Sequence, residues 1–176
     1  MRAIFTEESV YYGLRDMRSV LYDEPLFDVE PDYIAKVIAD VAESHGVIFD
    51  VTPQLKRMNG RAGYYRSKRG YVARVSERLM DNLSQFIATS IHEITHIKLQ
   101  FGTDERHFRT GPADESEAYI VEYRVCSAFG LIPTSTFIWR LKNYGARNNV
   151  EMVRIKQCID FADDLILEIA ERVGAG

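Results

Sequence analysis

The sequence predicts an α+β fold, mainly helical, with a small sheet of about three strands and a long helix at its centre. Apolar residues recur at intervals of three and four over several stretches that are long enough for helices. Short runs rich in β-branched and aromatic residues lie together between residues 47 and 75. The length of 176 residues, with 46% hydrophobic and 27% charged residues, suits about one globular domain.

The first helix follows an N-terminal arm. Residues 1–30 mix aromatic and acidic residues without a clear period, so they predict an irregular or short-helical arm before a domain of residues 31–176. Pro31 and Asp32 are typical of a helix start, and Gly46 of its end. The apolar face of this helix comprises Ile34, Val37, Ile38 and Val41.

The predicted strands lie in the next part of the chain. Residues 47–51 are short and β-branched, which favours a strand. A strand pair is predicted at residues 63–66 and 70–75, because tyrosines and valine supply strand propensity there. Residues 67–69 would form the turn between them.

The rest of the chain is predicted to be helical. Residues 80–100 carry apolar side chains at threes and fours and form the central helix. A polar loop at residues 101–111 leads to a second helix at residues 112–129. A short helix at residues 134–144 and a long amphipathic helix at residues 151–172 complete the prediction.

Composition excludes several classes of protein. A net charge of -4 gives no reason to expect general nucleic-acid binding. The two cysteines are too few for a disulfide scaffold. The sequence has no run of about 18 apolar residues that could span a membrane, and its N-terminus lacks the layout of a signal peptide. We therefore expect a soluble, cytoplasmic protein that does not associate with membranes.

One segment departs from the acidic average. Between Val51 and Ser76 there is no acidic residue. The seven cations of this basic tract are Lys56, Arg57, Arg61, Arg66, Lys68, Arg69 and Arg74.

The strongest chemical signal is an H-E-x-x-H motif in the central helix. His92 and His96 are four residues apart, so their imidazoles lie on one helix face one turn apart, as two ligands of a tetrahedral zinc ion require. Glu93 lies about 100° round the helix, where it can reach a water molecule at the metal more easily than the metal itself. A shuffled chain of this composition would contain the motif about once in a hundred times. The alternative is two ordinary surface histidines beside a solvated glutamate.

A zinc site of this kind needs a third protein ligand and leaves a fourth position for water. The position six residues after the second histidine is Gly102, which excludes the three-histidine form of the motif. His107 lies across the loop and stays within reach. The next helix offers Glu115 and, as its alternative, Glu117; a regular helix cannot turn both toward one metal. Glu122 lies further along, as an acid that supports a ligand or faces solvent.

At these residues the chain resembles the ArdC-type antirestriction and ImmA/IrrE-like zincin metallopeptidases. The resemblance covers about residues 32–170, and it is carried by residues 92–96 (HEITH), 115–119 (ESEAY), 130–133 (GLIP) and 159–166 (IDFADDLI). It implies a zincin-like fold with the H-E-x-x-H motif on the central helix, and one zinc ion per chain with Glu115 as third ligand. It also implies a specific cytoplasmic protein substrate in a phage, plasmid or other mobile-element setting.

The predicted mechanism is peptide hydrolysis by an activated water molecule. Zinc activates the water, and Glu93 takes its proton as general base and passes it to the leaving amine. A further donor usually stabilises the oxyanion or contacts the substrate. The candidates, each of which is more often structural, are Tyr64, Tyr65, His107, Arg109 and Tyr119.

The predicted hairpin has two interpretations within this mechanism. Peptidases of this type hold an extended substrate against an edge strand, and a basic hairpin would then favour acidic peptides. The simpler interpretation, which we prefer, is a solvated strand edge protected by charge.

Two other functions remain open. The basic tract of residues 56–74, with tyrosines among its cations, could bind nucleic acid. The protein would then be an antirestriction or regulatory module without proteolysis, and its zinc would be structural. The third alternative is an inactive relative of the peptidases that binds a protein partner through the groove where a peptidase would hold its substrate.

Overall fold

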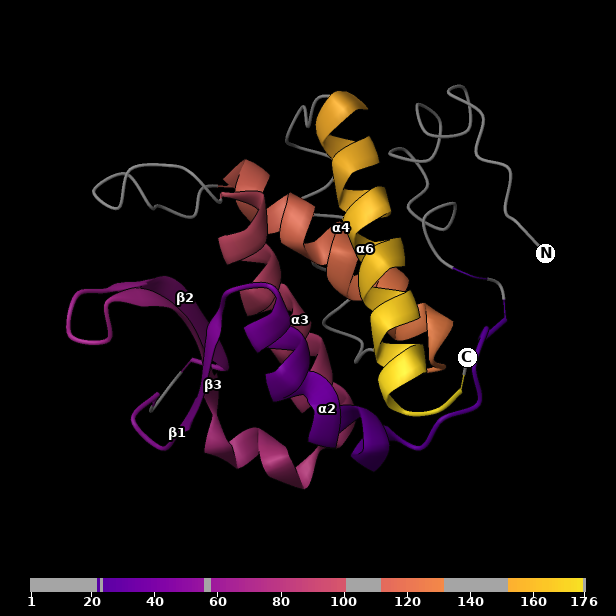
Figure 1. Ribbon diagram of the computed structural model, residues 1–176, viewed down its shortest axis with the longest axis horizontal. Coiled ribbons are helices and arrows are strands. Elements are labelled where there is room, and N and C mark those ends of the chain that lie inside the picture. The colour runs from indigo at the N-terminus through magenta and orange to yellow at the C-terminus, as the bar shows by residue number, and fades with distance from the viewer. Residues whose placement is uncertain (1–21, 23, 56–57, 101–111, 132–151, 176) are drawn as a thin grey trace.

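An α+β architecture is found, as predicted, in the computed structural model, which describes residues 22, 24–55, 58–100, 112–131 and 152–175. Four α-helices and a three-stranded sheet make up this described part (Figure 1). The helix predicted at residues 134–144 and the loop at 101–111 lie outside it, and the predicted arm is described only at residues 22 and 24–30. Within these residues, none of the helices has the length and apolar character needed to cross a membrane.

The sheet has the strand order β1-β3-β2. β1 (Ile48–Thr52) pairs in parallel with β3 (Gly70–Ser76), and β2 (Gly60–Tyr65) pairs with β3 in antiparallel fashion. The predicted hairpin is therefore confirmed, but β2 begins three residues earlier than expected. Pairing with β3 extends the strand back through a glycine-containing stretch that has little strand propensity of its own. β2 is an edge strand.

The helices pack on one side of the sheet. They are α2 (Pro31–Ser44), α3 (Leu83–Leu99), α4 (Pro112–Ala128) and α6 (Met152–Arg172), and the 3-10 helix η2 (Glu77–Asp81) precedes α3. Figure 1 shows α3 between the sheet and the pair formed by α4 and α6. The central helix of the prediction is thus confirmed, although its first turn was placed three residues too early because η2 continues the apolar pattern.

The sequence of α3 explains its central place. The side chain of Asn82 caps the helix by accepting a hydrogen bond from the amide of Gln85 at 3.2 Å. Between residues 86 and 97 every side chain except that of Thr89 is buried, so the helix has no solvent face there. The buried hydroxyl groups of Ser90 and Thr95 donate to carbonyl oxygens one turn back, each at 2.7 Å, which avoids leaving them unpaired.

One hydrophobic core joins the elements from α2 to α6. The inner face of the sheet contributes Ala73 and Val75. Phe49 meets Phe86 of α3 edge to face, with ring centroids 6.1 Å apart. Residues 24–30 run without helix or strand along the end of α4, where the amides of Leu26 and Phe27 donate to one carbonyl oxygen.

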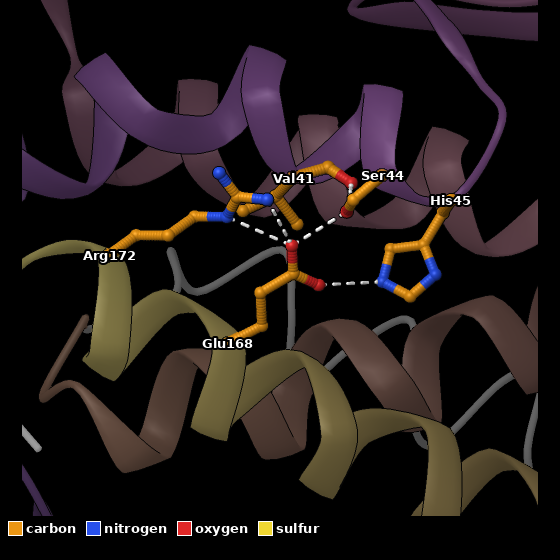
Figure 2. A network of polar contacts seen from close by, with 5 residues as sticks. All are labelled: Val41, Ser44, His45, Glu168 and Arg172. Atoms are coloured by element: carbon orange, nitrogen blue, oxygen red, sulfur yellow. Dashed lines mark hydrogen bonds and ion pairs between the residues drawn. The ribbon is translucent and has the colours of Figure 1, made fainter.

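A polar network ties the end of α2 to α6 (Figure 2). One oxygen of the Glu168 carboxylate accepts from Ser44 Oγ at 2.6 Å and from Arg172 Nε at 2.9 Å. The other oxygen lies 3.0 Å from His45 Nε2. Burial alone would raise the pKa of the Glu168 carboxyl, but the hydrogen bonds from Ser44 and Arg172 outweigh it and lower the pKa.

Replacing Glu168 by glutamine is expected to lower the free energy of unfolding at pH 7 by about 1–2 kcal/mol, because hydrogen bonds to a charged group are lost or weakened. Folding lowers this pKa, so the carboxylate stabilises the protein fully above the unfolded pKa of about 4.3 and loses that contribution as the pH falls through the folded pKa. Measured by urea unfolding, the difference in free energy of unfolding between the wild-type protein and Glu168→Gln should therefore become smaller below about pH 4.

The exposed Glu171 on the same helix provides the control. Glu171→Gln should change the free energy of unfolding by no more than about 0.5 kcal/mol. If Glu168→Gln lowered the free energy of unfolding by the same amount at neutral and at acid pH, the stabilising role of the ionised carboxylate would be wrong.

Candidate metal centre

Helix α3 brings its two motif histidines together as the sequence predicts. The Nε2 atoms of His92 and His96 lie 3.1 Å apart, one helical turn from each other. Both imidazoles are buried: 8% of the surface of His92 and 4% of that of His96 is exposed. Because the helix is buried on all sides here, the alternative of two surface histidines is wrong.

The first turn of α4 supplies a carboxylate to this pair. Glu115 places Oε2 3.3 Å from Nε2 of His92 and Oε1 3.3 Å from Nε2 of His96. The three residues offer ligand atoms that all lie within 4.8 Å of one another. We call His92, His96 and Glu115 the metal cluster.

The spacing of the metal cluster fits a tetrahedral ion. Metal–ligand bonds of about 2.0–2.1 Å at tetrahedral angles put neighbouring ligand atoms about 3.3 Å apart. The separations here are 3.1 Å between the two Nε2 atoms and 3.3 Å from each of them to a different oxygen of the Glu115 carboxylate. These residues could therefore bind a metal ion through three protein ligands.

A second carboxylate on α4 orients one of the histidines. Glu122 Oε2 accepts a hydrogen bond from Nδ1 of His92 at 2.9 Å. An ionised carboxylate can only accept, so this contact would keep the proton on Nδ1 if Nε2 bound a metal ion. Nδ1 of His96 is buried without a hydrogen-bond partner among the described residues. Of the two histidines, only His92 is oriented in this way within the described part of the chain.

Glu117, the alternative third ligand, points to another helix. Its carboxylate is buried and accepts two hydrogen bonds from Arg154 of α6, at 2.8 and 2.6 Å. Glu115 and Glu117 thus point to different partners, as their spacing on a regular helix predicts. Glu117 instead joins α4 to α6, and Glu115 completes the metal cluster.

Glu93 lies beside the cluster, between α3 and strand β2. Only 8% of the residue is exposed, and its carboxylate accepts a hydrogen bond from the amide of Ala62. Burial raises the pKa of Glu93 to about 7. His92 and Glu115 are near enough to affect this pKa, the first lowering it and the second raising it.

Charges in the cluster depend strongly on one another. Burial alone would lower the pKa of the His92 imidazole, but its hydrogen bonds with Glu115 and Glu122 outweigh burial and raise the pKa to about 10. Burial lowers the pKa of His96. Burial alone would raise the pKa of Glu115, yet its bonds with both histidines hold it well below its usual range. The carboxylates around His92 thus favour positive charge on its imidazole.

Tyr119, a candidate oxyanion donor, packs against a ligand. Its ring centroid lies 4.6 Å from that of His92, and it also stacks with Tyr123, with ring centroids 5.5 Å apart. The residue is 7% exposed. The ring of Tyr119 therefore packs against the imidazole of His92.

The two tyrosines of β2 lie on opposite faces of the sheet. Tyr64 shares a face with Ala62, because side chains two residues apart in a strand point the same way, and it meets Tyr71 edge to face at 5.2 Å. Tyr65 lies on the other face, under the guanidinium of Arg74 at 4.2 Å. Of these two candidates, Tyr64 is on the side of Glu93. His107 and Arg109 lie outside the described residues.

Part of the basic tract is neutralised within the sheet. Asp50 of β1 lies 3.3 Å from Nζ of Lys68 and 3.1 Å from Nε of Arg74. The side chains of Arg61, Arg66 and Arg69 are exposed. Lys56 and Arg57 lie outside the described residues. The described tract therefore presents fewer unopposed charges than its sequence implies.

Two contributions to the site were not indicated by sequence patterns. They are the amide of Ala62 and the bare backbone of Gly60, both of which contact Glu93. Asn59 and Gly60 have the composition of a turn, so nothing local shows that this stretch is a strand next to α3. The one available signal was general: an edge strand has free backbone amides, and one of them could bind the carboxylate of Glu93.

Comparisons with known proteins do not identify the chain. No family model matches it, and no curated protein and no solved structure matches it significantly. Its function must therefore be inferred from the chemistry of the site: two imidazoles and a carboxylate at tetrahedral spacing, next to a buried glutamate.

Proposed function

We propose that the protein is a zinc-dependent metallopeptidase of zincin type, with the metal cluster as zinc ligands and Glu93 as general base. The observation that carries the proposal is the position of Glu93. The glutamate lies buried beside three residues whose ligand atoms lie within 4.8 Å of one another. A structural metal site would have no need of such a group.

The donor set supports zinc over other ions. Two imidazole nitrogens and one carboxylate oxygen are a common set for catalytic zinc, which keeps its fourth position for water. Calcium and magnesium prefer six or more oxygen ligands, and copper(II) and nickel(II) favour square or tetragonal arrangements. The 3.1 Å separation of the two imidazole Nε2 atoms is close to the ligand spacing of the tetrahedron that zinc adopts.

In the proposed mechanism Glu93 transfers one proton, from the attacking water molecule to the leaving amine. His92, His96 and Glu115 would hold the zinc ion, which would supply Lewis-acid activation of a water molecule and of the substrate carbonyl. Glu93 takes the proton of the attacking water and delivers it to the leaving amine. The amide of Ala62 keeps the carboxylate in place. Tyr64 is the described residue that we propose as oxyanion donor.

Strand β2 supports a polypeptide as substrate. It is an edge strand, and the amide of Ala62 turns away from β3 toward Glu93. An extended polypeptide that adds a strand beside β2 would therefore lie next to the general base. Exposed Arg61 would then meet acidic residues of the substrate, although a solvated basic edge accounts for its position equally well.

Metal analysis and a cleavage assay test the proposal together. The purified protein should contain about one zinc per chain by mass spectrometry, in keeping with a three-ligand site. It should cleave members of a degenerate peptide library, lose that activity with 1,10-phenanthroline, and regain it when zinc is added. If the protein bound zinc but cleaved no peptide of the library, the proposed hydrolase activity would be wrong. Salt-dependent binding of DNA by the zinc-loaded protein would then support the nucleic-acid module.

A further inference from the structure

We propose that Gly60 is a positioning residue for Glu93. In this view, the missing side chain at the start of β2 is the space that holds the Glu93 carboxylate beside the metal cluster. The proposal rests on the proposed function, because it assigns Gly60 a part in placing the general base. It adds a residue that lies 33 positions from Glu93 in the sequence and is not itself part of the H-E-x-x-H motif.

Glu93 fills the place that a side chain at Gly60 would take. A Cβ atom built on Gly60 would lie 2.5 Å from Oε1 of Glu93, 2.6 Å from Cγ and 2.8 Å from Cδ. Contacts between carbon atoms are favourable only near 3.5–4.0 Å. Three consecutive atoms are too close, so a rotation of the carboxylate alone does not remove the overlap.

Backbone conformation does not account for the glycine. Among the described glycines, those with positive φ are Gly46, Gly130 and Gly174, and Gly60 is not one of them. An alanine could therefore adopt the backbone of residue 60 without strain. The requirement comes from the neighbouring carboxylate.

Glu93 has little room to give way. It is 8% exposed, and the amide of Ala62 holds its carboxylate from the same strand. Strand β2 is also held at this end, where the amide of Ser76 donates to the carbonyl oxygen of Asn59 at 2.8 Å. A methyl group at Gly60 must therefore push the carboxylate off the Ala62 amide and away from its place near His92.

The test compares Gly60→Ala with the wild-type protein, both loaded with zinc. Zinc affinity should stay within about threefold, because no ligand contacts Gly60, while kcat on a cleaved library peptide should fall about 100-fold with KM unchanged. Gly60→Ala in a Glu93→Gln background should cause no further loss of kcat. An unchanged kcat, or a weakened zinc affinity, would overturn the proposal.

A second readout needs no enzymatic activity. Gly60→Ala should lower the melting temperature by about 3–8 °C in the wild-type background, as overpacking predicts. In a Glu93→Ala background the same change should shift it by less than about 1 °C, because the new methyl group enters the vacated space. Gly63→Ala, whose added Cβ would meet only Tyr65 at 3.6 Å, is the matched stability control in the same strand and should behave alike in both backgrounds.

The two readouts separate this proposal from the proposed function. If the wild-type protein hydrolyses no peptide, the proposed function fails, and the melting temperatures still decide whether Gly60 fixes Glu93. An equal loss of stability from Gly60→Ala in both Glu93 backgrounds would show that the strand itself requires glycine, and the positioning role would be wrong.

Discussion

The His92→Ala/His96→Ala double variant is expected to contain no bound zinc, whereas the wild-type chain should bind about one equivalent. Removal of both imidazoles leaves Glu115 as the single member of the metal cluster, and one carboxylate cannot hold zinc against water. Zinc content by mass spectrometry after gel filtration measures the difference. The melting temperature provides a second measurement: zinc stabilises a protein that binds it only when folded, by about 4 kcal/mol at a thousandfold excess over Kd. The double variant should not respond to added zinc.

Two neighbouring glutamates of α4 provide the matched controls for this prediction. Glu115→Gln removes a ligand and should weaken zinc binding strongly, while Glu117→Gln removes the same charge two residues away, where the carboxylate bonds Arg154. Glu117→Gln should lower stability and retain about one zinc per chain. Full retention of zinc in the double histidine variant would place the metal elsewhere.

The same titration distinguishes Glu122 from the ligands. Glu122 touches His92 only through Nδ1, at 2.9 Å, so Glu122→Gln should keep the site and weaken zinc affinity by about 10–100-fold. A loss as complete as that of the double variant would instead indicate that Glu122 binds the metal directly.

Glu93→Gln is expected to keep zinc and to lower kcat by about 10²–10⁴-fold. Glutamine has the shape of glutamate, and its carbonyl oxygen can still accept the hydrogen bond from the Ala62 amide. The amide cannot take a proton from water, so the general base is lost while the fold and the metal cluster remain. Steady-state cleavage of a library peptide by equally zinc-loaded proteins measures the ratio.

Charge removal far from the site controls for indirect effects on hydrolysis. Glu171→Gln on the exposed face of α6 should leave kcat unchanged. Equal turnover by Glu93→Gln and the wild-type protein would remove Glu93 as general base. If Glu93→Gln bound zinc and cleaved the peptide as fast as Glu171→Gln does, another residue near His92 would have to activate the water molecule.

Local sequence patterns were sufficient to predict most of the helices and the two histidines of the site. Helical spacing on α3 placed His92 and His96 on one face, and the same periodicity located α2, α4 and α6. The hairpin of β2 and β3 was also predictable, because its turn is short and its strands are adjacent in the chain. The parallel pairing of β1 with β3 was not, since no local pattern specifies which distant strands meet.

Among the carboxylates, the sequence left a choice that packing resolved. Glu115 and Glu117 differ by two positions and have similar neighbours, so their spacing from His96 could not separate them. The rotation of α4 about its axis settles their directions: Arg154 of α6 bonds Glu117, and the opposite side of the helix carries Glu115 and Glu122 to the histidines. That rotation depends on how α4 packs against two helices at once.

The sequence by itself determined an α+β chain with two imidazoles and a glutamate on one buried helix, because helix periodicity and apolar spacing are properties of neighbouring residues. The tertiary structure alone decided that Glu115 completes the cluster, that Glu122 orients His92, and that β2 holds Glu93. These contacts join segments that are distant in the sequence, and their distances depend on the packing of the whole core.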